Sequence, residues 1–258
     1  MGRFGSCLLK TLLPLLLAWL VLVSADPLGG ERAYLVVLDA SGSMEWPFSG
    51  GGGRKMDAAK EAVRLASSAL GRGDEMGLMV FYTCGDVRLE APVGSAPEEI
   101  SEALEPVEPV GATPIAESIR RAWEEMRGVR KEPHIVLVTD GGETCGGLPI
   151  EEGFAVWRES GGRLRIDVIA VDISPAFNAT ILPILGGVPN QIRLDYERLA
   201  RETGGFYVEV SDREGIIEAM KRITGRRERE VYYLVLPSLV PVALLVCLGL
   251  RAREADDP

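Results

Sequence analysis

The chain has 258 residues, of which 47% are hydrophobic and 26% are charged, and its formal net charge is −10. This length is sufficient for one domain with a substantial core plus terminal segments. An acidic surface repels the phosphate backbone, so we expect no nucleic-acid partner.

The N-terminus has the pattern of a membrane-directed segment. Residues 1–10 include Arg3 and Lys10, residues 11–23 are almost entirely apolar, and residues 23–25 resemble a small-residue cleavage site. We therefore predict a signal peptide or an N-terminal anchor over residues 1–25. The sequence leaves open whether this segment is cleaved.

The first predicted strand leads directly into a polar cluster. Residues 33–38 form an apolar run typical of a buried strand. Asp39, Ser41 and Ser43 follow it at alternate positions, so in an extended chain their side chains point the same way. Hard oxygen ligands of this kind suit a small divalent cation, which indicates metal-dependent binding.

An irregular segment, residues 44–54, separates this strand from the next helix. It contains four consecutive glycines, at positions 50–53, beside Trp46 and Phe48. We interpret the glycine run as a flexible insertion. The two aromatic side chains either contact a partner or hold the loop against the core.

Strand-like and helix-like segments then alternate, which is typical of a parallel sheet with helices on both faces. A turn at residues 83–86 separates two strand-like runs and predicts a hairpin. The strands of the hairpin are predicted at 76–82 and 87–93, and further strands at 135–139, 164–173 and 206–210. Helices are predicted at 55–70, 98–104, 114–127, 151–160, 196–203 and 213–224.

The chain has four cysteines, and two of them lie in the central region. Cys84 follows the second strand and Cys145 lies shortly after Asp140, so we expect both near the carboxyl ends of the strands. An exported domain with two cysteines can form a disulfide, which would stiffen the loop after Asp140. Two unpaired core cysteines are the alternative.

Two later residues extend the polar cluster. Thr113 precedes a predicted helix, and Asp140 ends the buried strand at 135–139. Because the carboxyl ends of parallel strands gather ligands at one edge of the sheet, we expect Asp39 and Asp140 to meet there with the three hydroxyl side chains. Taken singly, Thr113 can be a helix cap and Asp140 a turn residue.

The C-terminal part predicts a membrane span. Residues 231–250 carry no charge, and a spanning helix needs about 20 such residues. A charged linker at 226–230 precedes this span and a short cytoplasmic tail at 251–258 follows it. The basic N-terminus favours an extracytoplasmic central domain. We expect a cell-membrane protein, single-pass, or two-pass if the N-terminal segment is retained.

Catalysis by side chains is not expected. His134 is the only histidine, and it lies at the amino end of a buried strand, opposite the predicted ligand edge. Glu143 is the nearest candidate base to Asp140, and we interpret it as a solvated loop carboxylate. The prediction is therefore a binding protein and not an enzyme.

The polar cluster resembles the metal-ion-dependent adhesion site of the von Willebrand factor A-type domain family, in which Asp-x-Ser-x-Ser is followed by a Thr and then an Asp. The matching residues are Asp39, Ser41, Ser43, Thr113 and Asp140. The resemblance covers residues 31–225. It implies a doubly wound α/β fold with a mostly parallel sheet, one antiparallel edge strand and helices on both faces.

The same resemblance implies the ligand. The two serines would coordinate Mg²⁺ through their hydroxyls, with Mn²⁺ or Ca²⁺ as alternatives, and Thr113 and the two aspartates would act directly or through water. Neutral hydroxyls leave the ion under-compensated, so a carboxylate from a partner protein can complete its shell.

We therefore expect a membrane-anchored, extracytoplasmic adhesion module that engages an acidic group of a partner protein. Candidate contacts lie in the irregular segments 44–54 and 174–192. They are Trp46, Phe48, Phe177 and Ile181. The alternative is a subunit of a membrane-bound assembly that works with an ATPase, in which the metal site serves an internal contact.

Overall fold

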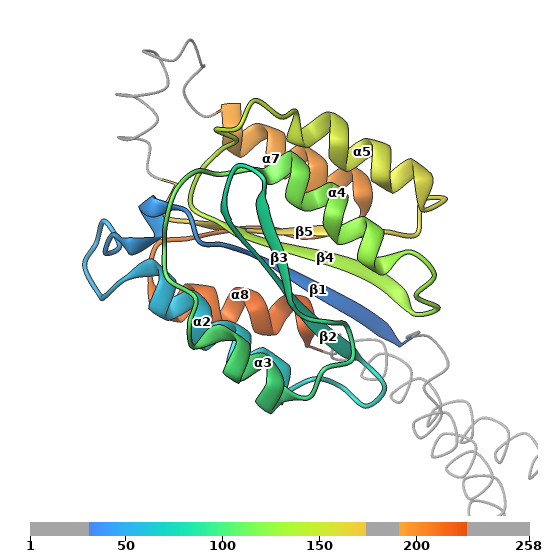
Figure 1. The fold of residues 1–258 in the computed structure, drawn as a ribbon, viewed down its shortest axis with the longest axis horizontal. Coiled ribbons are helices and arrows are strands. Elements are labelled where there is room, and N and C mark those ends of the chain that lie inside the picture. Colours follow the sequence, from blue (N-terminus) through green and yellow to red (C-terminus); the bar gives the residue numbers. More distant parts are fainter. Residues whose placement is uncertain (1–30, 174–190, 226–258) are drawn as a thin grey trace, which may run out of the picture. The chain divides into compact units, whose positions relative to one another are not determined.

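The computed structural model of this chain describes residues 31–173 and 191–225. They form a six-stranded sheet between two layers of helices (Figure 1). The strand order is β3-β2-β1-β4-β5-β6, and neighbouring strands are parallel except for β2 and β3. The predicted doubly wound α/β fold with one antiparallel edge strand is confirmed.

Every predicted strand and helix in the described residues is present. The strands are β1 (Arg32–Asp39), β2 (Glu75–Thr83), β3 (Asp86–Ala91), β4 (Glu132–Thr139), β5 (Arg165–Val171) and β6 (Tyr207–Val210). The helices are the 3₁₀ turn η1 (Gly42–Glu45), α2 (Lys55–Ser68), α3 (Pro97–Leu104), α4 (Ile115–Met126), α5 (Pro149–Glu159), α7 (Gln191–Thr203) and α8 (Arg213–Thr224). Helix α7 starts earlier than predicted because its first turn buries no side chain that would mark it in the sequence.

Different helices cover the two faces of the sheet. Helices α2, α3 and α8 pack on one face, and α4, α5 and α7 on the other (Figure 1). Successive side chains of β1 alternate between these layers, so that Val36 joins the first core and Val37 the second. Because both faces are covered, the central strands read as continuous apolar runs.

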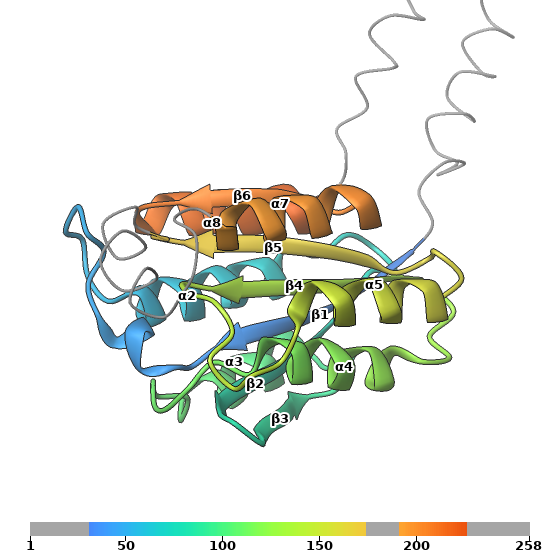
Figure 2. The ribbon, with the colours of Figure 1, turned by 90° about the horizontal axis from the view of Figure 1, so that it is seen from above.

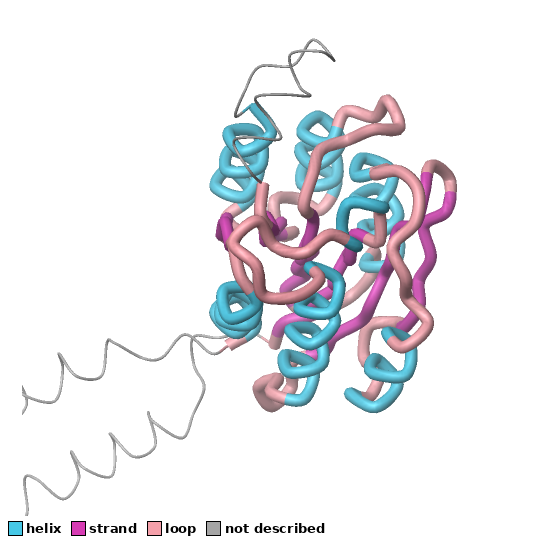
Figure 3. Tube along the Cα trace, turned by 90° about the vertical axis from the view of Figure 1, so that its left-hand side faces the viewer, coloured by secondary structure: helices cyan, strands magenta, loops and turns pink. Residues whose placement is uncertain are grey.

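The carboxyl ends of the parallel strands lie together at one end of the sheet (Figure 2). The chain connects β1 to β2 on one side, whereas β4 flanks β1 on the other side. The carboxyl ends of β1 and β4 therefore form the topological switch point, where open α/β sheets bind ligands. We call this end the rim, made of residues 39–54, 83–86, 109–114 and 140–147. Figure 3 views the molecule from this side, with loops crossing in front of the strands.

At the end opposite the rim, the first strand is tied to the last helix. The Tyr34 hydroxyl donates to the carbonyl of Ile223 at 3.2 Å. Arg32 donates to the Tyr34 hydroxyl at 2.8 Å and to the carbonyl of Gly225 at 3.4 Å. The described domain therefore begins and ends at neighbouring points.

Residues 44–54, expected as an insertion, form a closed hairpin. Pro47 and Arg54 pair as an antiparallel bridge, and the Phe48 N–H donates to the carbonyl of Gly53 at 3.2 Å. Three glycines, at positions 51–53, have positive φ, which side chains with a Cβ rarely adopt. The glycines thus allow a tight reversal of the chain.

The hairpin is also held from outside. Ser49 donates to the carboxylate of Asp172, just beyond β5, from its backbone N–H at 2.7 Å and from its hydroxyl at 2.6 Å. Phe48 is 2% exposed and lies in the core under α2 and α8, whereas Trp46 is 53% exposed. Phe48 is therefore a core residue and the prediction that it contacts a partner is wrong. That Trp46 contacts a partner stays a prediction.

Within the described residues, no helix combines the length and apolarity needed to cross a membrane. Several predictions fall outside those residues. They concern the N-terminal segment 1–25, the linker 226–230, the span 231–250, the tail 251–258, and the contact candidates Phe177 and Ile181.

Candidate functional site

Asp39 ends β1 as a fully buried carboxylate. One of its oxygens accepts a hydrogen bond from the backbone N–H of Ser41 at 2.7 Å, and the other accepts from the hydroxyl of Thr139 at 2.5 Å. The strand register explains the second contact, because Leu38 pairs with Val138 and places the next residue of each strand side by side. Thr139 was not singled out from the sequence, where it reads as the end of an apolar strand.

Ser41 and Ser43 converge, but not through the extended backbone that the sequence suggested. Ser41 is the residue before the 3₁₀ turn η1, and Ser43 lies inside this turn. The two hydroxyl oxygens are 3.3 Å apart, and the Ser43 hydroxyl donates to Oδ1 of Asp140 at 2.7 Å. A tight turn thus brings the first motif onto the aspartate that follows β4.

Asp140 also binds a residue that sequence reasoning missed. Nζ of Lys55 lies 2.9 Å from Oδ2 of Asp140, and the two side chains are only 7% and 1% exposed. Lys55 is the first residue of α2, whose N-terminus faces the rim. The available signal was a lysine directly after a rim loop, at the start of a helix with many buried positions.

Thr113 lies in the rim loop before α4 and is 6% exposed. Its backbone N–H donates to the hydroxyl of Thr144 at 2.7 Å, and its carbonyl accepts from the backbone N–H of Thr144 at 3.0 Å. Pro114, and not Thr113, occupies the N-cap of α4. Among the described residues no hydrogen bond joins the Thr113 hydroxyl to Asp39, Asp140 or the serines, so Thr113 is the least engaged of the five.

Backbone contacts hold the Thr113 loop against the first motif. The N–H of Gly42 donates to the carbonyl of Gly111 at 3.3 Å, and the N–H of Val110 donates to the carbonyl of Ala40 at 2.6 Å. Gly111 has a φ of 78°, and a Cβ there would lie 2.6 Å from the Cβ of Thr83. Only glycine satisfies both the backbone conformation and this close approach.

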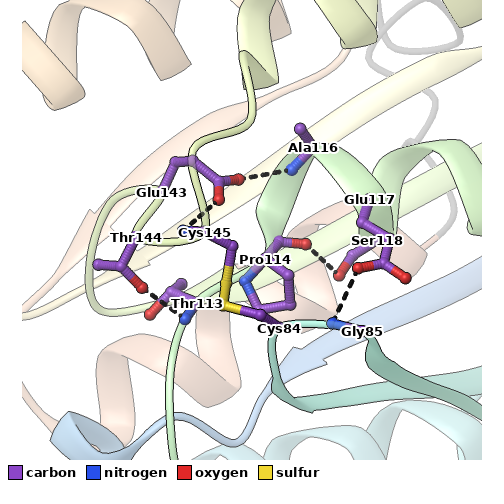
Figure 4. Close-up of a disulfide and its surroundings, with 10 residues drawn as sticks. All are labelled: Cys84, Gly85, Thr113, Pro114, Ala116, Glu117, Ser118, Glu143, Thr144 and Cys145. Carbon is purple, nitrogen blue, oxygen red and sulfur yellow. Dashed lines mark hydrogen bonds between the residues drawn. A yellow bond between two sulfur atoms is a disulfide. The ribbon is translucent and has the colours of Figure 1, made fainter.

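A disulfide between Cys84 and Cys145 joins the β2–β3 turn to the loop after Asp140 (Figure 4). This is the pairing that the sequence predicted. Beside it, the Glu143 carboxylate accepts from the N–H of Ala116 at 2.9 Å, in the first turn of α4, and from the N–H of Cys145 at 2.7 Å. Glu143 therefore stabilises the N-terminus of α4 and is not the solvated carboxylate expected from the sequence.

His134 lies within the fold, as expected. Nδ1 of its ring is 2.8 Å from Oδ2 of Asp167, and the ring centroid lies 5.0 Å from that of Tyr34. It is 6% exposed and belongs to the amino-terminal half of β4, whereas Asp140 follows the carboxyl end. The histidine is thus separated along its strand from the polar cluster of the rim.

Burial dominates the electrostatics of the cluster. Removal from water, reinforced by the nearby charge of Asp140, raises the pKa of Asp39 to about 7, although its hydrogen bonds to Ser41 and Thr139 act in the opposite direction. The Tyr196 hydroxyl donates to the carbonyl of Gly141 at 3.0 Å, and burial raises the pKa of this phenol. The site therefore disfavours a negative charge on Asp39, and a bound cation would favour that charge.

This carboxylate makes stability depend on pH. With divalent ions removed by a chelator, folded Asp39 keeps its proton up to about pH 7, whereas the unfolded chain loses it near pH 4. Between these values the folded state binds the extra proton, so the free energy of unfolding is expected to fall as pH rises, by up to about 1.4 kcal/mol per pH unit. Urea unfolding of wild type and Asp39→Asn across this window measures the effect. A wild-type minus Asp39→Asn difference that does not change with pH would contradict it.

The oxygen set fits a small divalent cation. Two carboxylates and two hydroxyls lie within one hydrogen-bonded cluster, and oxygen ligands of both kinds suit Mg²⁺. Among the described residues, no three His, Cys, Asp or Glu side chains are grouped to hold a metal ion. Any cation bound at this rim would therefore depend on the serine hydroxyls. The Lys55 ammonium on Asp140 is a positive charge within the same cluster.

Comparison with known proteins supports the fold. Residues 34–143 match the family model of the von Willebrand factor type A domain. The chain is 27% identical over 184 residues to the uncharacterized protein YwmC of Bacillus subtilis (strain 168), covering 64% of this chain and 79% of that protein. The folded region thus has a von Willebrand factor A-like α/β fold.

Two solved structures show the same likeness. A von Willebrand factor type A protein from Catenulispora acidiphila has 18% identity and a TM-score of 0.58, with 77% of this chain and 42% of that chain covered. The vWF domain of the type V pili tip protein Mfa5 from Porphyromonas gingivalis has 12% identity and a TM-score of 0.57, covering 76% of this chain and 95% of that one. At these identities the likeness is one of fold.

Proposed function

We propose that this chain is a membrane-anchored, extracytoplasmic protein-binding module that engages an acidic group of a partner through a divalent cation at the rim. The residues that would hold the cation are Asp39, Ser41, Ser43, Thr113 and Asp140. The proposed ion is Mg²⁺, with Mn²⁺ or Ca²⁺ as alternatives.

The convergence of Ser41, Ser43 and Asp140 carries the proposal. Ser43 and Asp140 are 97 positions apart in the sequence, yet the Ser43 hydroxyl donates to the Asp140 carboxylate at 2.7 Å. The same hydroxyl lies 3.3 Å from that of Ser41. Asp39 stabilises the cluster, since its carboxylate accepts a hydrogen bond from the backbone N–H of Ser41 at 2.7 Å. The closeness of these side chains supports the proposal that Asp39, Ser41, Ser43 and Asp140 act as one ligand cluster.

The surrounding residues restrict movement of this set. The disulfide, the Glu143 contacts and the two hydrogen bonds between Thr113 and Thr144 connect three rim loops (Figure 4). A bound divalent cation would offer an open coordination position to a carboxylate. Rigid loops lower the ordering cost of binding such a group.

The remaining parts of the proposal rest on other observations. Membrane anchoring rests on the apolar segments at 11–23 and 231–250. Trp46, which is 53% exposed next to η1, is the proposed aromatic contact beside the ion. The fold shared with the vWF domain of a pili tip protein is compatible with an adhesive role.

Calorimetric titration of Mg²⁺ and Mn²⁺ into the full-length protein in detergent tests the ion. Wild type is expected to bind, and Asp39→Ala and Ser41→Ala are expected to lose about ten- to a hundredfold in affinity, since each removes a ligand or its support. Asp57→Ala is the matched control, because Asp57 is an acidic residue of α2 that pairs with Arg54 outside the cluster. It is expected to bind like wild type.

A second step tests the acidic partner. Peptides containing Asp are compared with their Asn counterparts in Mg²⁺ and in chelator, and only the Asp peptides in Mg²⁺ are expected to bind. If folded wild type binds neither ion, the metal-dependent function is wrong, and the assembly alternative becomes the one to test by co-purification from membranes.

A further inference from the structure

The rim cluster already contains a positive charge of its own. The Lys55 ammonium is 2.9 Å from Oδ2 of Asp140, and this oxygen is the one that Ser43 leaves unused, since Ser43 donates to Oδ1. The pair is withdrawn from solvent, with side chains 7% and 1% exposed. Interaction between charges is strong where water is excluded, so this contact is a major electrostatic feature of the rim.

A second lysine on the same helix shows that the contact is specific. Lys60 is as buried as Lys55. Its ammonium lies 3.4 Å from the carbonyl of Glu105 and 3.6 Å from the carboxylate of Glu108, a side chain that is 61% exposed. A buried lysine on α2 therefore does not necessarily place its ammonium at the rim.

All four carboxylate oxygens of Asp39 and Asp140 are engaged. Asp39 accepts from Ser41 and Thr139, and Asp140 accepts from Ser43 and Lys55. Each carboxylate oxygen has a second lone pair, so a divalent cation can share an oxygen of Asp140 with its donor, but at Oδ2 it would lie beside the Lys55 ammonium. Ser43 has an oxygen of its own to offer the ion, whereas the ammonium of Lys55 has only donors and repels a cation.

We infer that Lys55 is a built-in antagonist of the divalent cation: its ammonium balances Asp140 while no ion is bound, and the ion binds only as Lys55 releases that carboxylate. This inference rests on the proposed function. It adds a residue that sets the affinity and that is absent from the five-residue ligand set. Removal of the charge should tighten ion binding, because it abolishes the repulsion between the ammonium and the cation.

The backbone of Lys55 restricts how the release occurs. Its N–H donates to the carbonyl of Trp46 at 3.1 Å, which closes the hairpin of residues 44–54. The release is therefore a rearrangement of the side chain and not of the start of α2. The hairpin that carries Trp46 is thus bonded to the residue that would respond to the ion.

The test compares Mn²⁺ binding to full-length wild type, Lys55→Gln, Lys55→Met and Lys60→Met by calorimetry in detergent. Both Lys55 variants are expected to bind Mn²⁺ at least about tenfold more tightly than wild type, and Lys60→Met to bind equally. Lys55→Gln removes the charge and keeps a polar side chain with a donor, so it remains informative if Lys55→Met does not fold.

Thermal unfolding supplies a readout that does not depend on the titration. In chelator, Lys55→Met is expected to melt below wild type because it leaves Asp140 without its counter-charge, and Mn²⁺ is expected to raise its Tm by more than it raises that of wild type. Equal or weaker binding by the Lys55 variants, with wild type binding, would overturn the antagonism and leave the metal site intact. No binding by any variant or by wild type would overturn both proposals.

Discussion

Replacing Cys84 and Cys145 by serine is expected to lower the free energy of unfolding by about 4 kcal/mol. The bond links residues 61 positions apart, and the chain-entropy model gives a stabilisation of this size for a loop of that length. Urea unfolding of oxidised wild type and of the double serine variant measures the difference.

The reduced wild type is the internal control. Reductant should shift its unfolding midpoint toward that of the double variant and should leave the variant itself unchanged. The loop after Asp140 is otherwise held through Glu143 and Thr144, so the variant is expected to fold. Coinciding midpoints for the oxidised wild type and the variant would show that the bond adds no stability.

Phe48→Ala is expected to destabilise the protein by about 3–5 kcal/mol, the usual cost of deleting a buried phenylalanine. Phe48 is 2% exposed and packs in the core under α2 and α8, although it belongs to a surface hairpin rich in glycine. The loss should appear in urea unfolding with the slope unchanged, because the same surface is exposed on unfolding.

Trp46→Ala is the matched control for this prediction. Trp46 is an aromatic residue of the same hairpin, two positions away, and is 53% exposed. Its replacement should cost less than about 1 kcal/mol, as is usual for exposed positions. If Phe48→Ala costs no more than Trp46→Ala, the hairpin is not anchored in the core.

The layered fold was predictable because two sequence signals identify its strands: a continuous apolar run and an aspartate at the end of that run. The runs that became β1 and β4 are apolar on both faces, which occurs where helices cover both sides of a sheet. Strand β1 ends in Asp39, and Asp140 directly follows β4. The bounds of α8 match the prediction because an apolar stripe extends over its whole length. Where that stripe was missing, as in the first turn of α7, the prediction began too late.

The site was predictable in its members and not in its geometry. Alternation in the sequence suggested an extended first motif, but the motif enters a 3₁₀ turn and the Ser43 hydroxyl donates a hydrogen bond to Asp140. The Lys55 contact depends on where α2 starts relative to β4, which is a tertiary property. Phe48 and Trp46 are equivalent in the sequence, and only the path of the hairpin separates core from surface.

The tie between β1 and α8 has a mechanical consequence. Residues 31 and 225 leave the domain at neighbouring points, so tension applied to both ends of the chain would first load the contacts of Arg32 and Tyr34 with Ile223 and Gly225. These hydrogen bonds would break one after another and would not bear the force together. The rim lies at the opposite end of the sheet, separated from these contacts by the length of β1, and the force would reach it last.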